Sequence, residues 1–133
     1  MNNFKFRFTS EIKLLYTTIL HRIIATKSFG DVQEGDLGGW VEFESNLSQD
    51  GNCWIYDNAI VMDNAIVKDS AKIKDNAMIY GNAIVQDSAE IKDNAHVFSH
   101  AIVKGNSIIS ESAKIYGRVV IEDEKISGVI ERT

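Results

Sequence analysis

Three histidines, His21, His96 and His100, are the side chains most suited to acid–base chemistry near neutral pH. A histidine can act as a general base when its pKa lies near neutrality and its substrate reaches it. His96 and His100 lie in a regular repeat, on opposite sides of a turn, and His21 lies outside that repeat. Because zinc needs three or four converging ligands, we expect no metal site. His96 and His100 remain candidate bases, and their ordinary interpretation is as surface or interface residues.

Acidic residues recur every 18 positions and form a second candidate site, here called the acidic ladder: Asp57, Asp75, Asp93 and Glu111. Stacked like charges repel each other unless amides, a cation or a basic partner neutralise them. The interpretation favoured here is turn chemistry, in which each aspartate bonds to amides of its own turn. The alternatives are divalent-cation binding, or a rod that imitates the charge of a nucleic acid for a basic partner.

His96, His100 and the acidic ladder lie in an uninterrupted six-residue repeat that runs from Gly51 to Glu122. Twelve hexads follow one another, as in DNAIVM, DNAIVK and DSAKIK, with alanine third in nine of them and Ile or Val fifth in all twelve. Positions three and five of a strand share one side, so each hexad predicts a polar corner followed by a short strand with one small and one β-branched inward residue. Cys53 takes a small inward position, and we expect it to be inert packing.

This repeat resembles the hexapeptide-repeat family, in which an aliphatic residue stands four positions before a small one, as Val61 stands before Ala65 and Ile79 before Ala83. The resemblance implies an all-β fold, a left-handed parallel β-helix with 18 residues per coil, so that residues 51–122 form about four coils. It also implies a trimer, which the residues alone do not distinguish from a dimer. For the acyltransferases of the family it implies a histidine base and a coenzyme A thioester bound between coils, but residues 51–122 lack the extruded loop that such enzymes use.

A narrower resemblance covers about residues 27–60, in the stretch GDLGGWVEFESNLSQDGNCWIYDNA. This stretch is similar to bacteriophage and prophage hexapeptide-repeat proteins, which are often labelled transferases without an assigned chemistry. The resemblance implies a phage or prophage origin.

The segments that flank the repeat are expected to cap it. We divide the chain into an N-terminal cap and connecting loop (residues 1–50), the β-helix (51–122) and a C-terminal cap (123–133). Phe4, Phe6 and Phe8 alternate with basic residues and predict a strand, with residues 17–26 as its hairpin partner. Residues 11–24 also fit a short amphipathic helix, and residues 29–49 are expected to be a loop.

Two outward-facing apolar ladders predict that the β-helix is covered by another surface. The aromatic ladder, named for three of its four members, is Met62, Tyr80, Phe98 and Tyr116. The isoleucine ladder is Ile66, Ile84, Ile102 and Val120. A continuous apolar stripe is seldom left in water, so we expect these eight residues to form a homo-oligomer interface, with the N-terminal hairpin as the alternative cover. The remaining face, with Trp54, Lys72 and Glu90, is expected to be largely solvated.

Composition and charge narrow the function classes. The formal net charge of −5 argues against direct nucleic-acid binding, and no stretch approaches the roughly 18 apolar residues that span a membrane. A single cysteine cannot form an internal disulfide and fits a reducing cytoplasm, which the phage resemblance implies is that of a bacterial host cell. We expect a non-catalytic interaction protein that presents its β-helix to a host protein, for example one in defence or regulation. The alternatives are an acyl-coenzyme A-dependent transferase with an intersubunit active site, for which the thioester would be needed, and an acidic inhibitor that imitates a nucleic acid.

Overall fold

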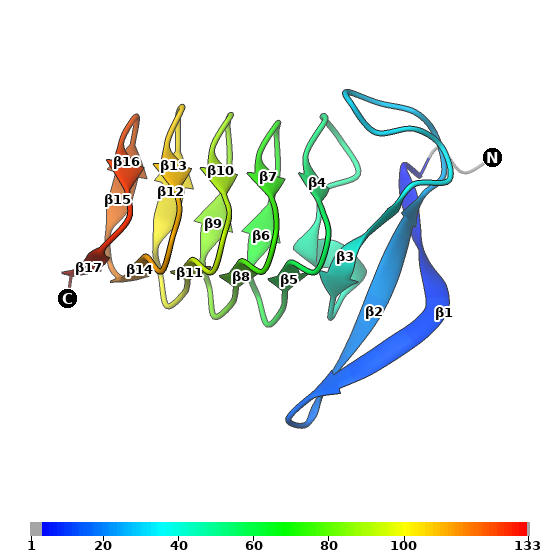
Figure 1. The fold of residues 1–133 in the computed structure, drawn as a ribbon, viewed down its shortest axis with the longest axis horizontal. Helices are drawn as coiled ribbons and strands as arrows, with labels where there is room; N and C mark the ends of the chain where they lie inside the picture. The colour runs from blue at the N-terminus through cyan, green and yellow to red at the C-terminus, as the bar shows by residue number, and fades with distance from the viewer. Residues whose placement is uncertain (1–3, 133) are drawn as a thin grey trace.

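The computed structural model describes residues 4–132, and its regular structure is almost entirely β-strand (Figure 1). The chain winds into a β-solenoid of about five stacked turns of about 18 residues, and the strands pair in parallel across successive turns. The all-β, parallel coil predicted from the hexads is confirmed. Within residues 4–132, no helix is long and apolar enough to cross a membrane.

Three sheets form the sides of the column. The first face consists of β4 (Trp54–Ile55), β7 (Lys72–Ile73), β10 (Glu90–Ile91), β13 (Ile108–Ile109) and β16 (Lys125–Ile126). The second face consists of β5 (Ile60–Val61), β8 (Met78–Ile79), β11 (His96–Val97), β14 (Lys114–Gly117) and β17 (Val129–Arg132). The third face consists of β6 (Ile66–Val67), β9 (Ile84–Val85), β12 (Ile102–Lys104) and β15 (Val120–Glu122).

The corners between the strands depend on a left-handed backbone at the first position of each hexad. In all twelve hexads this residue has a φ between 57° and 84°. Aspartate, asparagine and glycine adopt this conformation at least cost, which explains why Asp and Gly dominate the position. Ser99 and Glu111 adopt it as well, so the surrounding coils impose the corner even on less suitable residues.

The interior of the column contains the third and fifth residue of each hexad, as the repeat predicts. From Cys53 to Ile121, no residue at either position is more than 3% exposed. A small residue beside a β-branched one suits this narrow interior, because two large residues per strand would not fit.

The N-terminal segment is a β-hairpin, which excludes the helical alternative for residues 11–24. Strand β1 (Phe6–Leu15) pairs antiparallel with β2 (Thr18–Ala25), and β2 pairs with β3 (Leu37–Val41). The last of these strands joins β5 in parallel, so the hairpin extends the second face into a sheet of eight strands. Figure 1 shows the hairpin, in blue, projecting away from the column at its N-terminal end.

Part of the segment that we expected to be a loop, residues 29–49, belongs to the solenoid. It contains β3 and a short 3₁₀ helix, η1 (Glu44–Asn46), and Leu47 bridges in parallel to Val67. Gly38 and Gly39 are not turn residues here. A Cβ on Gly39 would lie 2.5 Å from the carbonyl oxygen of Ala59, so glycine permits β3 to approach the next coil.

The first face is covered at its N-terminal end, contrary to the expectation for Trp54. This side chain is 1% exposed and packs edge-to-face against Phe6 and Phe29, with ring centroids 6.4 and 5.4 Å away. Asp31 anchors the covering loop, because it accepts hydrogen bonds from Tyr56 (2.7 Å) and Lys72 (3.3 Å). Sequence periodicity shows that Trp54 points outward from the coil, but not that another segment lies over it.

The solenoid also continues past the last regular hexad. Strands β16 and β17 pair in parallel with β13 and β14, at separations of 17 and 15 positions instead of 18. The final turn is therefore shorter than the others but remains part of the same sheets.

Candidate functional site

The two apolar ladders lie on the outside of the column. On the second face, Tyr80, Phe98 and Tyr116 stack in parallel, with ring centroids 4.9 and 4.8 Å apart and interplanar angles of 2° and 9°. On the third face, paired strands bring the isoleucine ladder into register. Its end members Ile66 and Val120 are 39% and 56% exposed.

The hairpin covers only the N-terminal end of the second face. Leu15, Tyr16 and Thr18, at the hairpin tip, line one side of an open groove of about 390 Å³. The other side, from β5, β8 and β11, is lined by Met62, Met78, Tyr80 and His96. We call this the hairpin groove. Phe98, Tyr116 and the whole isoleucine ladder lie outside its lining.

His96 is the only one of the three histidines that lines the hairpin groove. Its Nδ1 lies 3.2 Å from the hydroxyl oxygen of Tyr80, whose ring meets the imidazole edge-to-face. Burial, and secondly the charge of Lys114, lower the pKa of His96 below 6.5. The lowered pKa favours the neutral imidazole, which is the form that a general base requires.

The other histidines do not join His96. His100 is exposed at the following corner. His21 lies in the hairpin, where its ring stacks on Phe8 with centroids 4.3 Å apart. Within residues 4–132 no three His, Cys, Asp or Glu side chains are grouped so as to hold a metal ion.

The acidic ladder is linked by hydrogen bonds between coils. The carboxylates of Asp57, Asp75 and Asp93 accept from the backbone N–H of the ladder residue 18 positions later, at 3.2, 3.1 and 2.8 Å. The same bond recurs at the other corners, for example from the Gly81 amide to Asp63 (3.0 Å). These three aspartate carboxylates thus accept from amides of the next coil, and not from amides of their own turn as the sequence predicts.

A buried lysine closes the N-terminal end of the column. Lys5 is 1% exposed, and its Nζ donates to the carbonyl oxygens of Cys53 (2.8 Å), Gly51 (3.1 Å) and Asp50 (3.4 Å). The Sγ of Cys53 lies 3.2 Å from the same nitrogen. Burial lowers the pKa of Lys5 and raises that of Cys53. No sequence pattern predicts this contact, because Lys5 alternates with phenylalanines as a solvated strand residue would.

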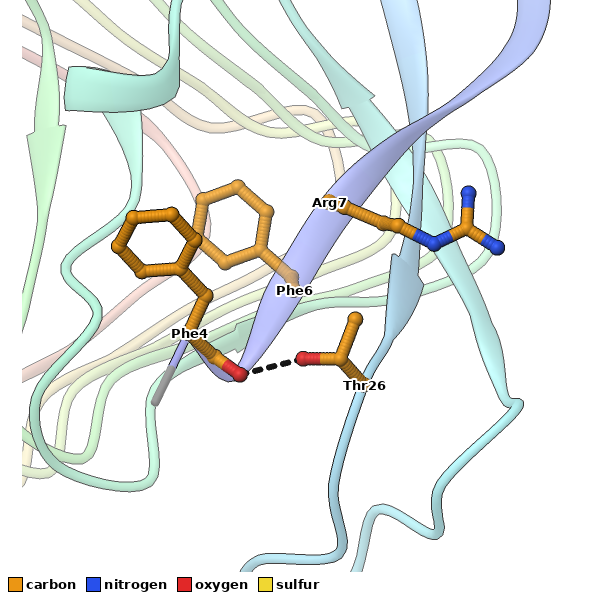
Figure 2. A pocket seen from close by; sticks show the side chains of 4 residues that line it. All are labelled: Phe4, Phe6, Arg7 and Thr26. Atoms are coloured by element: carbon orange, nitrogen blue, oxygen red, sulfur yellow. Dashed lines mark hydrogen bonds between the residues drawn. The ribbon is translucent and has the colours of Figure 1, made fainter. Parts of the chain in front are cut away.

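A second cavity, of about 250 Å³, lies at the start of β1 and is lined by Phe4, Phe6, Arg7 and Thr26 (Figure 2). The hydroxyl of Thr26 donates to the carbonyl oxygen of Phe4 at its edge. None of the residues predicted from the sequence as a functional site lines this cavity.

Comparison with known proteins supports the β-solenoid fold, and one similar protein is named as an acetyltransferase. The family model described as the YdcK β-solenoid repeat matches residues 77–90. An Escherichia coli (strain K12) protein named "Uncharacterized acetyltransferase YdcK" is 41% identical over 64 residues, which are 47% of this chain and 20% of that protein. The chain therefore matches only about a fifth of its relative's length.

Proposed function

We propose that this chain is an assembly and interaction module, a rigid solenoid that associates with further copies of itself and presents its remaining surface to another protein. The observation that carries the proposal is the isoleucine ladder, which the hairpin groove leaves uncovered. Ile66 and Val120, at its two ends, remain 39% and 56% exposed.

The shape of the third face supports self-association. Ile66, Ile84 and Ile102 project from three consecutive strands in register, so they form a straight apolar strip rather than scattered residues. Burial of such a strip stabilises an assembly by about 25 cal/mol per Å² of apolar surface. The aromatic ladder lies on the adjoining second face and would extend the same contact. A three-sided column that associates with other copies through this one edge is compatible with the trimer that the hexapeptide-repeat resemblance implies.

Light scattering after size-exclusion chromatography tests this proposal. The unmodified chain should have a mass that is a multiple of 14.9 kDa. Replacing both Ile84→Asp and Ile102→Asp should lower that mass, because two carboxylates would be buried in an apolar contact. Ser110→Asp, on the first face, is the matched control and should leave the mass unchanged. A double variant that keeps the mass of the unmodified chain would contradict the proposal.

The partner proposed for the remaining surface is a protein of a bacterial host cell, which accords with the phage resemblance of residues 27–60. Pull-down from bacterial lysate with the unmodified chain, and with a variant that is altered on the first face by Lys92→Glu and Ser110→Asp, tests this part. Repeated recovery of one protein that the variant loses would support it. Recovery of no protein, or of the same protein by both chains, would count against a partner on this face.

A second candidate function is acyl transfer from a coenzyme A thioester, and the position of His96 in the hairpin groove favours it. In this reaction the neutral imidazole would take the proton of an acceptor hydroxyl or amine as that group attacks the thioester carbonyl. The carbon–sulfur bond then breaks, and the thiolate leaves and is protonated. The name of the E. coli relative supports the same activity, and the similarity covers 20% of that protein's length.

Thermal unfolding with acetyl-coenzyme A tests the second candidate. Saturable stabilisation that disappears in His96→Ala and persists in His100→Ala would establish the hairpin groove as the thioester site. His100 is the suitable control because it is exposed and does not line the groove. No stabilisation at any concentration of acetyl-coenzyme A would refute this candidate and leave the assembly proposal standing.

A further inference from the structure

Two cations lie against one tryptophan on the hairpin, close to the hairpin groove. The ammonium nitrogen of Lys13 lies 4.4 Å from the centre of the Trp40 ring, and the guanidinium carbon of Arg22 lies 5.4 Å from it. The three residues come from β1, β2 and β3, which are neighbours in the eight-stranded sheet. We call Lys13, Arg22 and Trp40 the cation cluster.

The register of the strands places the cation cluster beside the groove. Residues two positions apart in a strand share a face, so Lys13 lies on the same face as Leu15, about 7 Å away along β1. Arg22 and Trp40 pair directly across β2 and β3. Trp40 also belongs to a buried hydrophobic cluster, against which three lining residues of the groove pack: Leu15, Met62 and Met78.

The side chains of the cation cluster are all hydrogen-bond donors. Within residues 4–132, neither Lys13 nor Arg22 forms a salt bridge. Arg22 donates through its Nε to the carbonyl oxygen of Gly38 (2.9 Å). The indole N–H of Trp40, a side chain that is 8% exposed, finds no acceptor in the described part of the chain. Because a buried donor without an acceptor is unfavourable, the cluster lacks a group that accepts hydrogen bonds.

The charges of the cluster indicate what that group is. Burial, and secondly the charge of Arg22, lower the pKa of Lys13. Two half-buried cations therefore repel each other here, and no carboxylate of residues 4–132 pairs with either of them. An oxyanion would accept hydrogen bonds from both side chains and neutralise this repulsion.

We propose that the cation cluster holds the oxyanion of a ligand, a carboxylate or a phosphate, whose apolar chain lies in the hairpin groove. The groove has a volume of about 390 Å³, within the range of small-molecule sites, and Leu15, Met62 and Met78 give it an apolar lining. Charge complementarity therefore selects an amphipathic anion over a neutral apolar molecule. The proposal depends neither on the isoleucine ladder nor on acyl transfer, because it involves no thioester and no proton transfer to His96.

Tryptophan fluorescence reports this binding, because the chain has two tryptophans and one of them belongs to the cation cluster. A Trp54→Phe variant, which keeps Trp40 as the reporter, is titrated with decanoate and with decyl phosphate below their micelle concentrations. We expect a saturable change with at least one of them, and the tighter ligand identifies the oxyanion. Isothermal titration calorimetry on the unmodified chain should give the same order of affinities.

Three comparison ligands separate the two halves of the site. 1-Decanol has the chain without the charge, whereas acetate and inorganic phosphate have the charge without the chain. Each should bind about ten-fold or more weakly than the tighter amphipathic anion, because each loses either the charged hydrogen bonds or the apolar contact.

Variants of the cluster complete the test. Lys13→Met and Arg22→Met each keep an apolar stem and remove one charge, and each should weaken binding about ten-fold or more. Lys125→Met, at an exposed position of the first face, is the matched control and should leave the affinity unchanged. Circular dichroism checks the fold of each variant, and Lys13→Met is decisive by itself, because Arg22 also bonds to the backbone of Gly38.

Three results would overturn the proposal. The first is that neither decanoate nor decyl phosphate binds saturably to the unmodified chain. The second is that a comparison ligand binds as tightly as the amphipathic anions. The third is that the folded Lys13→Met variant keeps the affinity of the unmodified chain.

Discussion

The acidic ladder offers a measurable test of how one coil holds the next. Asp75 contributes in two ways: its carboxylate accepts the Asp93 amide hydrogen at 3.1 Å, and its own backbone has a φ of 57°. Three substitutions separate these contributions. Asp75→Asn keeps an acceptor and tolerates the left-handed backbone, Asp75→Gly keeps only the backbone conformation, and Asp75→Ala keeps neither.

The expected losses of unfolding free energy follow from these contributions. The hydrogen bond is worth about 1 kcal/mol net, and an alanine in the left-handed region costs about 1–2 kcal/mol. Asp75→Ala should therefore destabilise the chain by about 2–3 kcal/mol and Asp75→Gly by about 1 kcal/mol. Asp75→Asn should be close to neutral, because the lost charge assistance is offset by relief of repulsion between stacked carboxylates.

Urea unfolding at fixed protein concentration, followed by circular dichroism, measures this order. Asn76→Ala, at the adjacent exposed position of the same corner, is the matched control and should change little. If Asp75→Ala were as stable as Asp75→Asn, neither the inter-coil bond nor the left-handed corner would stabilise the column as described. If Asp75→Gly were less stable than Asp75→Ala, the backbone argument would be refuted.

Three other predictions concern the N-terminal end of the column and the hairpin groove. Lys5→Met should lower the unfolding free energy by about 1–3 kcal/mol in urea, because buried carbonyls lose their donor, and an unchanged midpoint would refute the capping role. Gly39→Ala should cost about 1–3 kcal/mol by the same measurement, because its Cβ would lie 2.5 Å from the carbonyl oxygen of Ala59; a neutral result would mean that β3 can move. The lowered pKa of His96 means that the unfolded chain binds this proton first, so stability should rise with pH between the folded-state pKa and 6.5. Thermal melts should show this slope, and it should flatten in His96→Gln; an equal slope in both chains would contradict the burial of His96.

The interior of the column was predictable because the repeat is regular. A small residue third and a β-branched residue fifth have one arrangement that buries both, and every such residue from Cys53 to Ile121 is buried. The corners were predictable for the same reason, since Asp and Gly recur where the chain must turn with a positive φ.

The features that the sequence did not reveal depend on contacts between distant segments. Trp54 is covered by Phe6 and Phe29, and nothing in the hexad shows that a segment 25 or more positions earlier folds back over it. Lys5 has the pattern of a solvated strand residue but is buried against carbonyls of the first coil. Likewise, the corner composition predicts that Asp75 binds an amide, but only the stacking of coils determines that this amide belongs to Asp93.

The bonds of the acidic ladder give the column a direction and a unit of length. Each carboxylate belongs to one coil and its amide to the next, so every internal coil both donates and accepts in the same sense along the axis. Duplication or removal of 18 residues would leave each remaining coil with a matching neighbour, whereas the gain or loss of one residue would misalign every later corner. Insertions and deletions of whole 18-residue turns should therefore be tolerated better than those of any other length.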